Sequence, residues 1–142
     1  MADFMFNIAK GAFVEKFRDS AANGGILLLK VADADDTMRD TDDIAALLAT
    51  VADEATDASY ARKTGLTGTI AVDDTNNRVD VDLPDQTWTA LAGAAITDAV
   101  VFYQEAAADA SRIPLTLHDF VITPDGSDVT IVFNASGFGR AA

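Results

Sequence analysis

An acidic stretch, DDTNNRVDVD at residues 73–82, holds oxygen-bearing side chains that could bind a cation or run acid–base chemistry. It contains four aspartates and two asparagines. An EF-hand calcium loop beginning at Asp74 would need a glycine at its sixth position and a glutamate at its twelfth. The chain has Val79 and Asp85 there, and the acidic run at residues 33–43 fails the same test. The sequence therefore favours a solvated acidic face and predicts no bound metal, with a weak cation site between loops or chains as the alternative.

Three further patterns could support catalysis, and each lacks a part that its chemistry needs. His118 is the only histidine, so a Ser-His-Asp triad would have to use it, yet no G-x-S-x-G turn presents a nucleophile. The Lys63–Thr64 pair lacks the glycine that precedes it in a phosphate-binding loop. Carboxylate pairs can cleave glycosides, but aromatic residues, which usually line such clefts, make up only 8% of the chain. The sequence predicts no catalytic residue, no cofactor and no enzymatic activity.

The composition limits the possible partners. The chain has 142 residues, of which 49% are apolar, and we expect a single structural domain over residues 1–142. It has no cysteine, which excludes thiol chemistry, Cys-bound zinc and disulfides. No apolar run reaches the ~18 residues of a membrane span, so no membrane partner is expected. The formal net charge of −13 repels nucleic-acid phosphate, so no nucleic-acid partner is expected.

The N-terminal half predicts two helices and one buried strand. Phe13, Val14 and Phe17 lie at helical spacing, and the continuous apolar run at residues 26–32 is typical of a strand buried on both faces. A second helix is expected to begin after a Thr41 cap, with aspartates in its first turn. Its apolar stripe consists of Ile44, Leu47, Leu48 and Val51.

After Tyr60 the apolar period changes from helical to alternating, which predicts strands. The turn residues DTNN join two alternating segments into a hairpin. We expect its inward side chains to share a core with the helical stripe; these are Ile70, Val79, Val81 and Leu83. Asp80 and Asp82 alternate with the valines and are expected to point into water.

Three later segments complete the predicted elements. Residues 87–92 and 99–105 favour strands, whereas residues 91–99 between them could be helical. The sequence TPDGS at residues 123–127 predicts a hairpin turn between strands at 113–122 and 128–134. The fold class expected from the whole pattern is α+β, mainly antiparallel β-sheet of sandwich- or barrel-like form, with one or two short helices.

Both ends of the chain are candidates for extended arms, at residues 1–12 and 135–142. Apolar residues near a chain end have few local partners, so a neighbouring protein could cover them. The candidate partner contacts are Phe4, Met5, Phe6, Trp88, Phe138 and Arg140. Two alternatives apply: Phe4 and Phe6 form an edge strand of their own domain, and Trp88 packs in the core.

Several phrases of the sequence together resemble a family of small structural proteins of tailed viruses, of the kind encoded among head and tail genes. The phrases are FNIAKG (6–11), YARKT (60–64), VDDTNNRVDVDLPDQTW (72–88), IPLTLHDF (113–120) and TPDGSDVTIVFNASGFGRA (123–141). They cover most of the chain, in order, and contain no catalytic signature.

The resemblance implies a virion component without enzymatic activity, made in the host cytoplasm. Within that class we expect a capsid decoration protein, also called a cement or minor capsid protein, on the outside of the shell. Its expected partners are the major capsid protein and further copies of itself, as a trimer by analogy. The alternatives are a tail or spike subunit, and a soluble binding module or hydrolase that uses His118.

Overall fold

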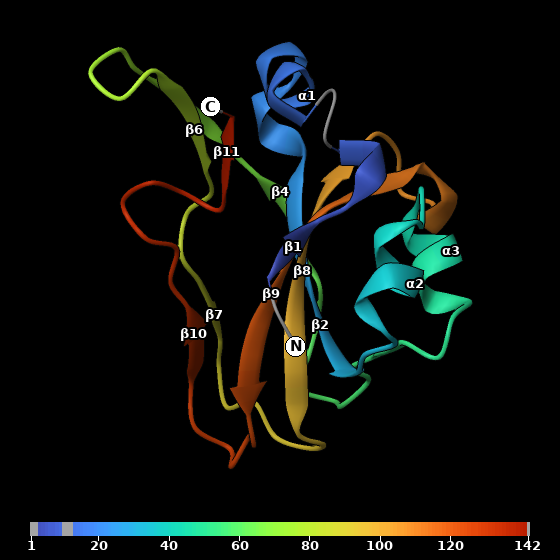
Figure 1. The fold of residues 1–142 in the computed structure, drawn as a ribbon. Coiled ribbons are helices and arrows are strands. Elements are labelled where there is room, and N and C mark those ends of the chain that lie inside the picture. Colours follow the sequence, from blue (N-terminus) through green and yellow to red (C-terminus); the bar gives the residue numbers. More distant parts are fainter. Residues whose placement is uncertain (1–2, 10–12, 142) are drawn as a thin grey trace.

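The computed structural model describes residues 3–9 and 13–141, and within them it is an α+β structure made mainly of antiparallel strands, as predicted (Figure 1). Three short α-helices are present among these residues, rather than one or two. The helices are α1 (Phe13–Asp19), α2 (Asp35–Arg39) and α3 (Ile44–Leu48), with 3₁₀ turns η1 (Asn7–Ala9), η2 (Ala21–Asn23) and η3 (Asp109–Ser111). The strands are β1 (Phe4–Met5), β2 (Gly24–Val31), β3 (Asp53–Glu54), β4 (Lys63–Leu66), β5 (Thr69–Asp73), β6 (Arg78–Asp82), β7 (Gln86–Trp88), β8 (Ile96–Gln104), β9 (Arg112–Ile122), β10 (Val129–Ile131) and β11 (Gly139–Ala141).

A central antiparallel sheet organises the chain. Its strand order is β1-β9-β8-β2-β3, and β4 also pairs with β2. The predicted buried strand is confirmed as β2, and residues 26–29 have no exposed surface. Both faces of the sheet are covered, by α2 and α3 on one side and by β6, β7 and β10 on the other (Figure 1). That double cover explains why β2 is continuously apolar instead of alternating.

The two faces of the sheet carry separate hydrophobic cores, so the predicted shared core is wrong. Val81 and Leu83 pack in the core that faces β7 and β10. Ile44 and Leu47 of α3 pack in the opposite core, together with Phe6. Successive residues of a strand point to opposite faces, and a helix on one face therefore cannot meet a hairpin on the other.

The β5–β6 hairpin is confirmed, in a register that pairs Ile70 with Val81 and Val72 with Val79. Asn77 adopts a left-handed φ of 51° in the turn, a conformation that asparagine tolerates better than most residues. Val81 is fully buried, whereas Val72, on the same face of the hairpin but nearer its turn, is 67% exposed.

The predicted second helix is shorter and begins later than expected. Helix α3 begins at Ile44, and the Asp43 side chain caps it by accepting a hydrogen bond from the Ala46 backbone N–H at 2.7 Å. Thr41 instead donates its hydroxyl to the Met38 carbonyl at the end of α2. Val51 lies beyond the helix and is 66% exposed, so it does not belong to the buried stripe.

The turn at residues 123–127 does not form the predicted hairpin. Strand β10 pairs with β7, not with β9. Val129 and Ile131 bury their side chains in the core that covers the central sheet, so the chain leaves the sheet and crosses into the second layer. Residues 91–99, which could have been helical, form no helix, and β8 already begins at Ile96.

Both chain ends contribute strands to the domain. β1 pairs with β9, and β11 pairs with β6. The edge-strand alternative for the N-terminus therefore holds for Phe4, while Phe6 lies just beyond β1 and is fully buried. Residues 1–2 and 10–12 of the expected N-terminal arm, and residue 142 of the C-terminal arm, lie outside the described residues.

Removal of the Phe6 ring should destabilise the domain strongly. Phe6 fills the core on the α2 side, and Phe→Ala changes in cores typically cost about 3–5 kcal/mol. The matched control is Ile8→Ala two residues later, where the side chain is 42% exposed and the expected loss is smaller. Denaturant unfolding measures both, and equal small losses would show that this segment is not docked in solution.

Candidate functional site

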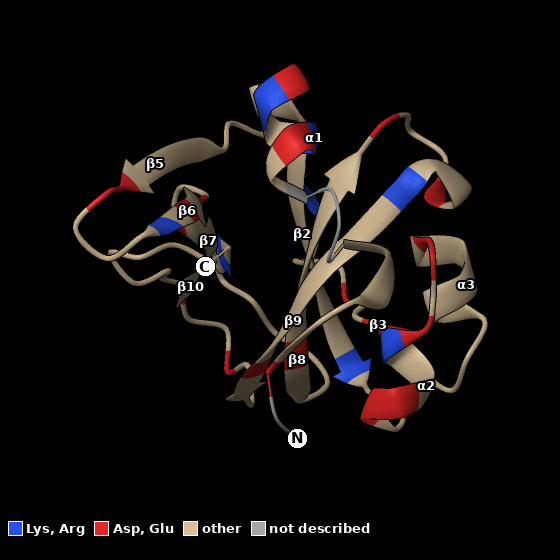
Figure 2. Ribbon diagram, turned by 45° about the horizontal axis from the view of Figure 1, so that its top comes forward, with Lys and Arg blue, Asp and Glu red and all other residues tan. Residues whose placement is uncertain are grey.

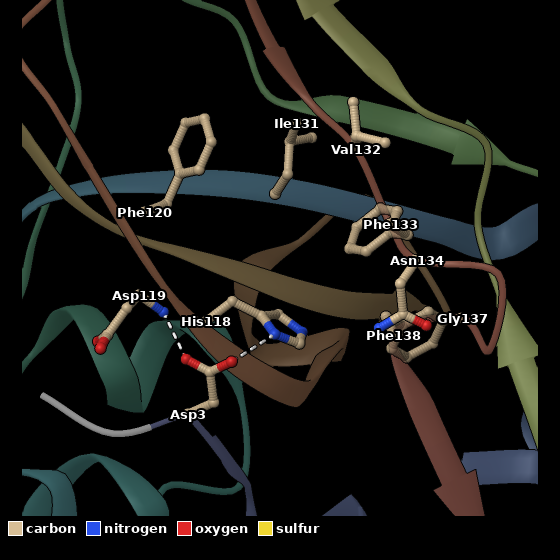
Figure 3. Close-up of a pocket in the computed structure, with 10 residues that line it drawn as sticks. All are labelled: Asp3, His118, Asp119, Phe120, Ile131, Val132, Phe133, Asn134, Gly137 and Phe138. Carbon is tan, nitrogen blue, oxygen red and sulfur yellow. Dashed lines mark hydrogen bonds and ion pairs between the residues drawn. The ribbon is translucent and has the colours of Figure 1, made fainter.

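The N-terminal segment and the segment leading into β11 approach β9 from two sides and leave a hollow of about 340 Å³ between them. A second hollow of about 220 Å³ adjoins it toward β10 (Figure 3). We call the joined space the terminal groove and define it by Asp3, Met5, His118, Phe138 and Arg140.

Backbone pairing fixes the N-terminal wall of the groove. Phe4 and Met5 pair with Leu117 and Thr116 of β9. The Asp3 carboxylate continues this pairing, because its Oδ1 accepts a hydrogen bond from the Asp119 backbone N–H at 2.8 Å. The wall therefore belongs to the edge of the central sheet.

A glycine fixes the opposite wall. Gly137 has a left-handed φ of 74°, and a Cβ there would lie 2.1 Å from the Val81 carbonyl oxygen. The close approach lets the Phe138 N–H donate to the same Val81 oxygen at 3.0 Å, which begins the β11–β6 pairing. Any side chain at Gly137 would push this wall away from β6.

The structure brings together four of the six candidate contact residues at this groove. Phe4 and Met5 are half-buried, Arg140 is exposed, and Phe138 is 6% exposed; all four line it. Trp88 is 2% exposed, donates its indole N–H to the Ala61 carbonyl at 2.8 Å and stacks on Tyr60. Trp88 is therefore a core residue, which is the alternative that the sequence left open for it. Phe6 is also fully buried and presents no outer surface.

His118 lies in the groove between a hydroxyl and a carboxylate. Its Nε2 is 2.9 Å from the Thr116 Oγ1. Its Nδ1 is 3.4 Å from the Asp3 Oδ2, and Figure 3 shows this contact. The Phe133 ring covers the imidazole at 6.1 Å between centroids. Strand alternation places Thr116 and His118 on one face, but no sequence signal could have found Asp3, because it is distant in the chain.

This hydroxyl–imidazole–carboxylate order is that of a catalytic triad, yet the site lacks an exposed nucleophile. Thr116 is only 4% exposed, so a substrate carbonyl cannot approach its hydroxyl without movement of the strands. A triad also needs donors aimed at the developing oxyanion. The half-buried imidazole beside Asp3 and Phe133 suits binding of a partner side chain better than acyl transfer.

In the acidic stretch at residues 73–82, which could have bound a cation, the Asp73 carboxylate accepts hydrogen bonds from the same chain. Hydrogen bonds from Asn76 to the Asp73 carboxylate hold the pKa of Asp73 below its usual value. Among the described residues, no group of three or more His, Asp or Glu side chains is placed to hold a metal ion.

Asp80 is buried rather than solvated, which corrects the predicted polar face. It is 8% exposed, and its two carboxylate oxygens lie 3.0 Å from Arg140 Nε and 3.0 Å from Arg78 Nε. Strand alternation predicted the correct face of the strand for Asp80, but Arg78 of β6 and Arg140 of β11 cover its carboxylate. The same ion pair holds Arg140 at the groove.

A second charge network lies within the YARKT phrase. Arg62 contacts Glu54 and Asp109, each at 2.5 Å, and these hydrogen bonds raise the pKa of Arg62 and lower that of Asp109. Tyr60 donates its hydroxyl to Glu54 and accepts the Leu28 N–H; burial, reinforced by Glu54, raises its pKa. The network joins β3, the segment before β4 and η3 to one another, and Tyr60 joins it to β2.

No helix among the described residues is long and apolar enough to cross a membrane. Comparison with protein-family models, with curated proteins and with solved structures found no match to this chain.

Proposed function

We propose that the chain is a structural protein of a tailed-virus particle, and that it decorates the outside of the capsid shell. The observation that carries the proposal is the resemblance of its phrases to small head and tail proteins, together with where those phrases lie. The phrases pack against one another as a framework, and the residues of these phrases that stay exposed border the terminal groove.

Three contacts join the phrases in pairs. Trp88 of the DLPDQTW segment donates to Ala61 of YARKT. The Phe6 N–H of FNIAKG donates to Leu115 of IPLTLHDF at 3.0 Å, and Phe138 donates to Val81. A resemblance that lies in framework contacts supports a shared fold and assembly role more than a shared reaction.

The charge distribution supports an outward-facing role. Eight of the nine described lysines and arginines form ion pairs with acidic side chains. Figure 2 shows the basic positions spread over several elements instead of gathered on one. The ninth, Lys63, donates to the Thr87 carbonyl and lies over the Trp88 ring. Phosphate binding needs clustered basic groups that can release counterions, so these paired cations argue against contact with packaged DNA.

We place the contact with the major capsid protein at the terminal groove, and self-association as a trimer on a shell symmetry axis. The groove combines half-buried apolar side chains, an imidazole and the exposed Arg140, which is the mixed character of a non-obligate interface. Weak contacts suffice, because a shell of many identical subunits and an oligomeric decoration protein sum them by avidity.

A charge placed at the rim of the groove should abolish shell binding without unfolding the chain. Val132 lines the groove and is 67% exposed. Val132→Glu is expected to weaken co-sedimentation with shells at least about tenfold, since one buried unpaired charge costs more than 1.4 kcal/mol. Val72→Glu is the matched control, with the same 67% exposure on the distant hairpin.

Three outcomes would redirect the proposal. Loss of binding by the Val72 variant alone would move the interface to the hairpin. Binding to tails instead of shells would favour a tail or spike subunit. A hydrolytic activity of the purified protein that His118→Ala removes would favour the enzyme alternative, because buried Thr116 and exposed Asp3 would then be functional partners of the imidazole.

A further inference from the structure

A small hollow beside β11 collects hydrogen-bond donors. It has a volume of about 230 Å³ and is lined by the turn at residues 134–137 and by the start of β11. Its polar side chains are those of Asn134, Ser136 and Arg140, and none of the described residues that line it is acidic. The chain as a whole has a formal net charge of −13, so a hollow without an acidic side chain is unexpected. We call this space the turn hollow.

The Arg140 guanidinium is held in place through one of its three nitrogens. Its Nε donates to the Asp80 Oδ1 at 3.0 Å, and Asp80 is 8% exposed. The Arg140 side chain is 45% exposed, and its two terminal amino groups have no hydrogen-bond or ion-pair partner among the described residues. The buried carboxylate therefore orients the guanidinium and leaves a parallel pair of donors open.

The turn orients two further donors. The Asn134 Oδ1 accepts the Ser136 backbone N–H at 2.7 Å, and the Asn134 carbonyl accepts the Gly137 N–H at 2.8 Å. Because the amide oxygen is used within the turn, the Asn134 Nδ2 remains as a donor. Within the described part of the chain, neither this Nδ2 nor the Ser136 hydroxyl has a hydrogen-bond partner. Donors that the fold has already positioned lose little entropy when a ligand binds.

We propose that the turn hollow is a carboxylate-binding site. The two terminal amino groups of Arg140 donate to the two carboxylate oxygens, and Asn134 Nδ2 and Ser136 Oγ donate to their remaining lone pairs. A planar guanidinium matches a carboxylate in this two-bond geometry. A carboxylate also brings a single negative charge, whereas a phosphate dianion meets stronger repulsion from a chain of net charge −13.

The position of the hollow indicates where the carboxylate comes from. Asn134, Phe138 and Arg140 line both the turn hollow and the terminal groove, which is our proposed contact with the major capsid protein. The ligand is therefore an aspartate or glutamate side chain of that protein. This choice of partner rests on the proposed function, whereas the carboxylate site itself belongs to the free chain.

An NMR titration of the full chain with sodium acetate tests the site without a capsid. The Arg140 Nε–H and the Ser136 and Gly137 amides should shift with one shared, saturable half-point, and sodium chloride at equal ionic strength should not reproduce the shifts. Ser136→Ala should raise the half-point about tenfold, the loss of one hydrogen bond to a charged group. Absence of a saturable shift, or tighter binding of sodium phosphate at the same signals, would overturn the proposal.

Asn134→Asp gives the sharpest variant. It keeps an oxygen for the Ser136 N–H, so the turn is retained, and it replaces the Nδ2 donor by a negative oxygen that repels a carboxylate. Acetate binding should be abolished. Asn77→Asp is the matched control, because it adds the same charge in the hairpin turn, where aspartate also tolerates the left-handed φ of 51°. Equal acetate affinities of the two variants would contradict the site.

Co-sedimentation with capsid shells tests the partner separately. Asn134→Asp should lose shell binding, and Asn77→Asp should retain it. Unchanged shell binding by Asn134→Asp would overturn the assignment of the carboxylate to the capsid protein. A parent chain that binds acetate but no shells would contradict the proposed function, and the acetate result would still support the site.

Discussion

Val81→Asp should unfold the domain or lower its free energy of unfolding by more than about 4 kcal/mol, the range reached when an unpaired charge enters a core. Val81 is fully buried and packs with Leu83 and Trp88 against the central sheet. Its carbonyl also accepts the Phe138 N–H, so displacement of β6 would release β11 as well. Circular dichroism melting gives the measurement.

Val72→Asp is the matched control for that experiment. It introduces the same carboxylate on the paired strand β5, at a side chain that is 67% exposed. We expect a change within about 0.5 kcal/mol, as for ordinary surface substitutions. Equal melting shifts for the two variants would show that the Val81 side chain is not packed in the core in solution.

Arg62→Leu should cost about 3 kcal/mol, because it leaves the largely buried Glu54 carboxylate without its cation, whereas Asp109 keeps its ion pair with Arg112. The Glu54 side chain is 14% exposed and the Asp109 side chain 34%. Hydration therefore stabilises the unpaired Glu54 carboxylate less than it would stabilise Asp109. Arg18→Leu removes an arginine whose ion pair with Glu15 is about 60% exposed on both sides, and it should cost no more than about 1 kcal/mol.

The pH dependence of the Arg62 effect has a defined sign. The Arg62 hydrogen bond lowers the pKa of Asp109 in the folded chain, so its stabilisation is complete above the ordinary aspartate value of about 3.9 and is lost as the pH falls below it. The stability difference between the parent and Arg62→Leu should therefore shrink from about pH 7 to about pH 3. A difference that is the same at both values would show that the arginine acts by packing alone.

The sequence was informative where a signal is local. The run at residues 26–32, the hairpin around the DTNN turn and the helix that contains Phe17 all depend on spacing and turn chemistry within about ten residues. Each of them is present. The helix cap was misplaced by two residues because Thr41 and Asp43 are both good capping residues, and only tertiary packing decides between them.

Contacts between distant segments could not be read in the same way. Alternation placed Asp80 opposite the valines, but nothing local indicated that Arg78 and Arg140 would cover it. The pairing of β10 with β7 follows from burial of Val129 and Ile131 over the central sheet, which the strong turn at residues 123–127 obscured. The groove itself depends on Asp3 meeting β9 more than 100 residues away.

The terminal groove unites residues that the sequence suggested for separate reasons. Phe4 and Met5 were candidates as apolar residues near one end, Phe138 and Arg140 as residues near the other, and His118 as the only histidine. The structure places all five along one hollow. That convergence is why the groove, and not the protruding hairpin or buried Trp88, is our proposed capsid-binding surface.

The copy number of this protein in purified virus particles tests the central proposal most directly. Quantitative mass spectrometry against the major capsid protein gives it in one experiment. A decoration protein that repeats with the symmetry of the shell should be present on the order of hundreds of copies per particle. A handful of copies, or absence from purified particles that contain the full set of head proteins, would contradict the account.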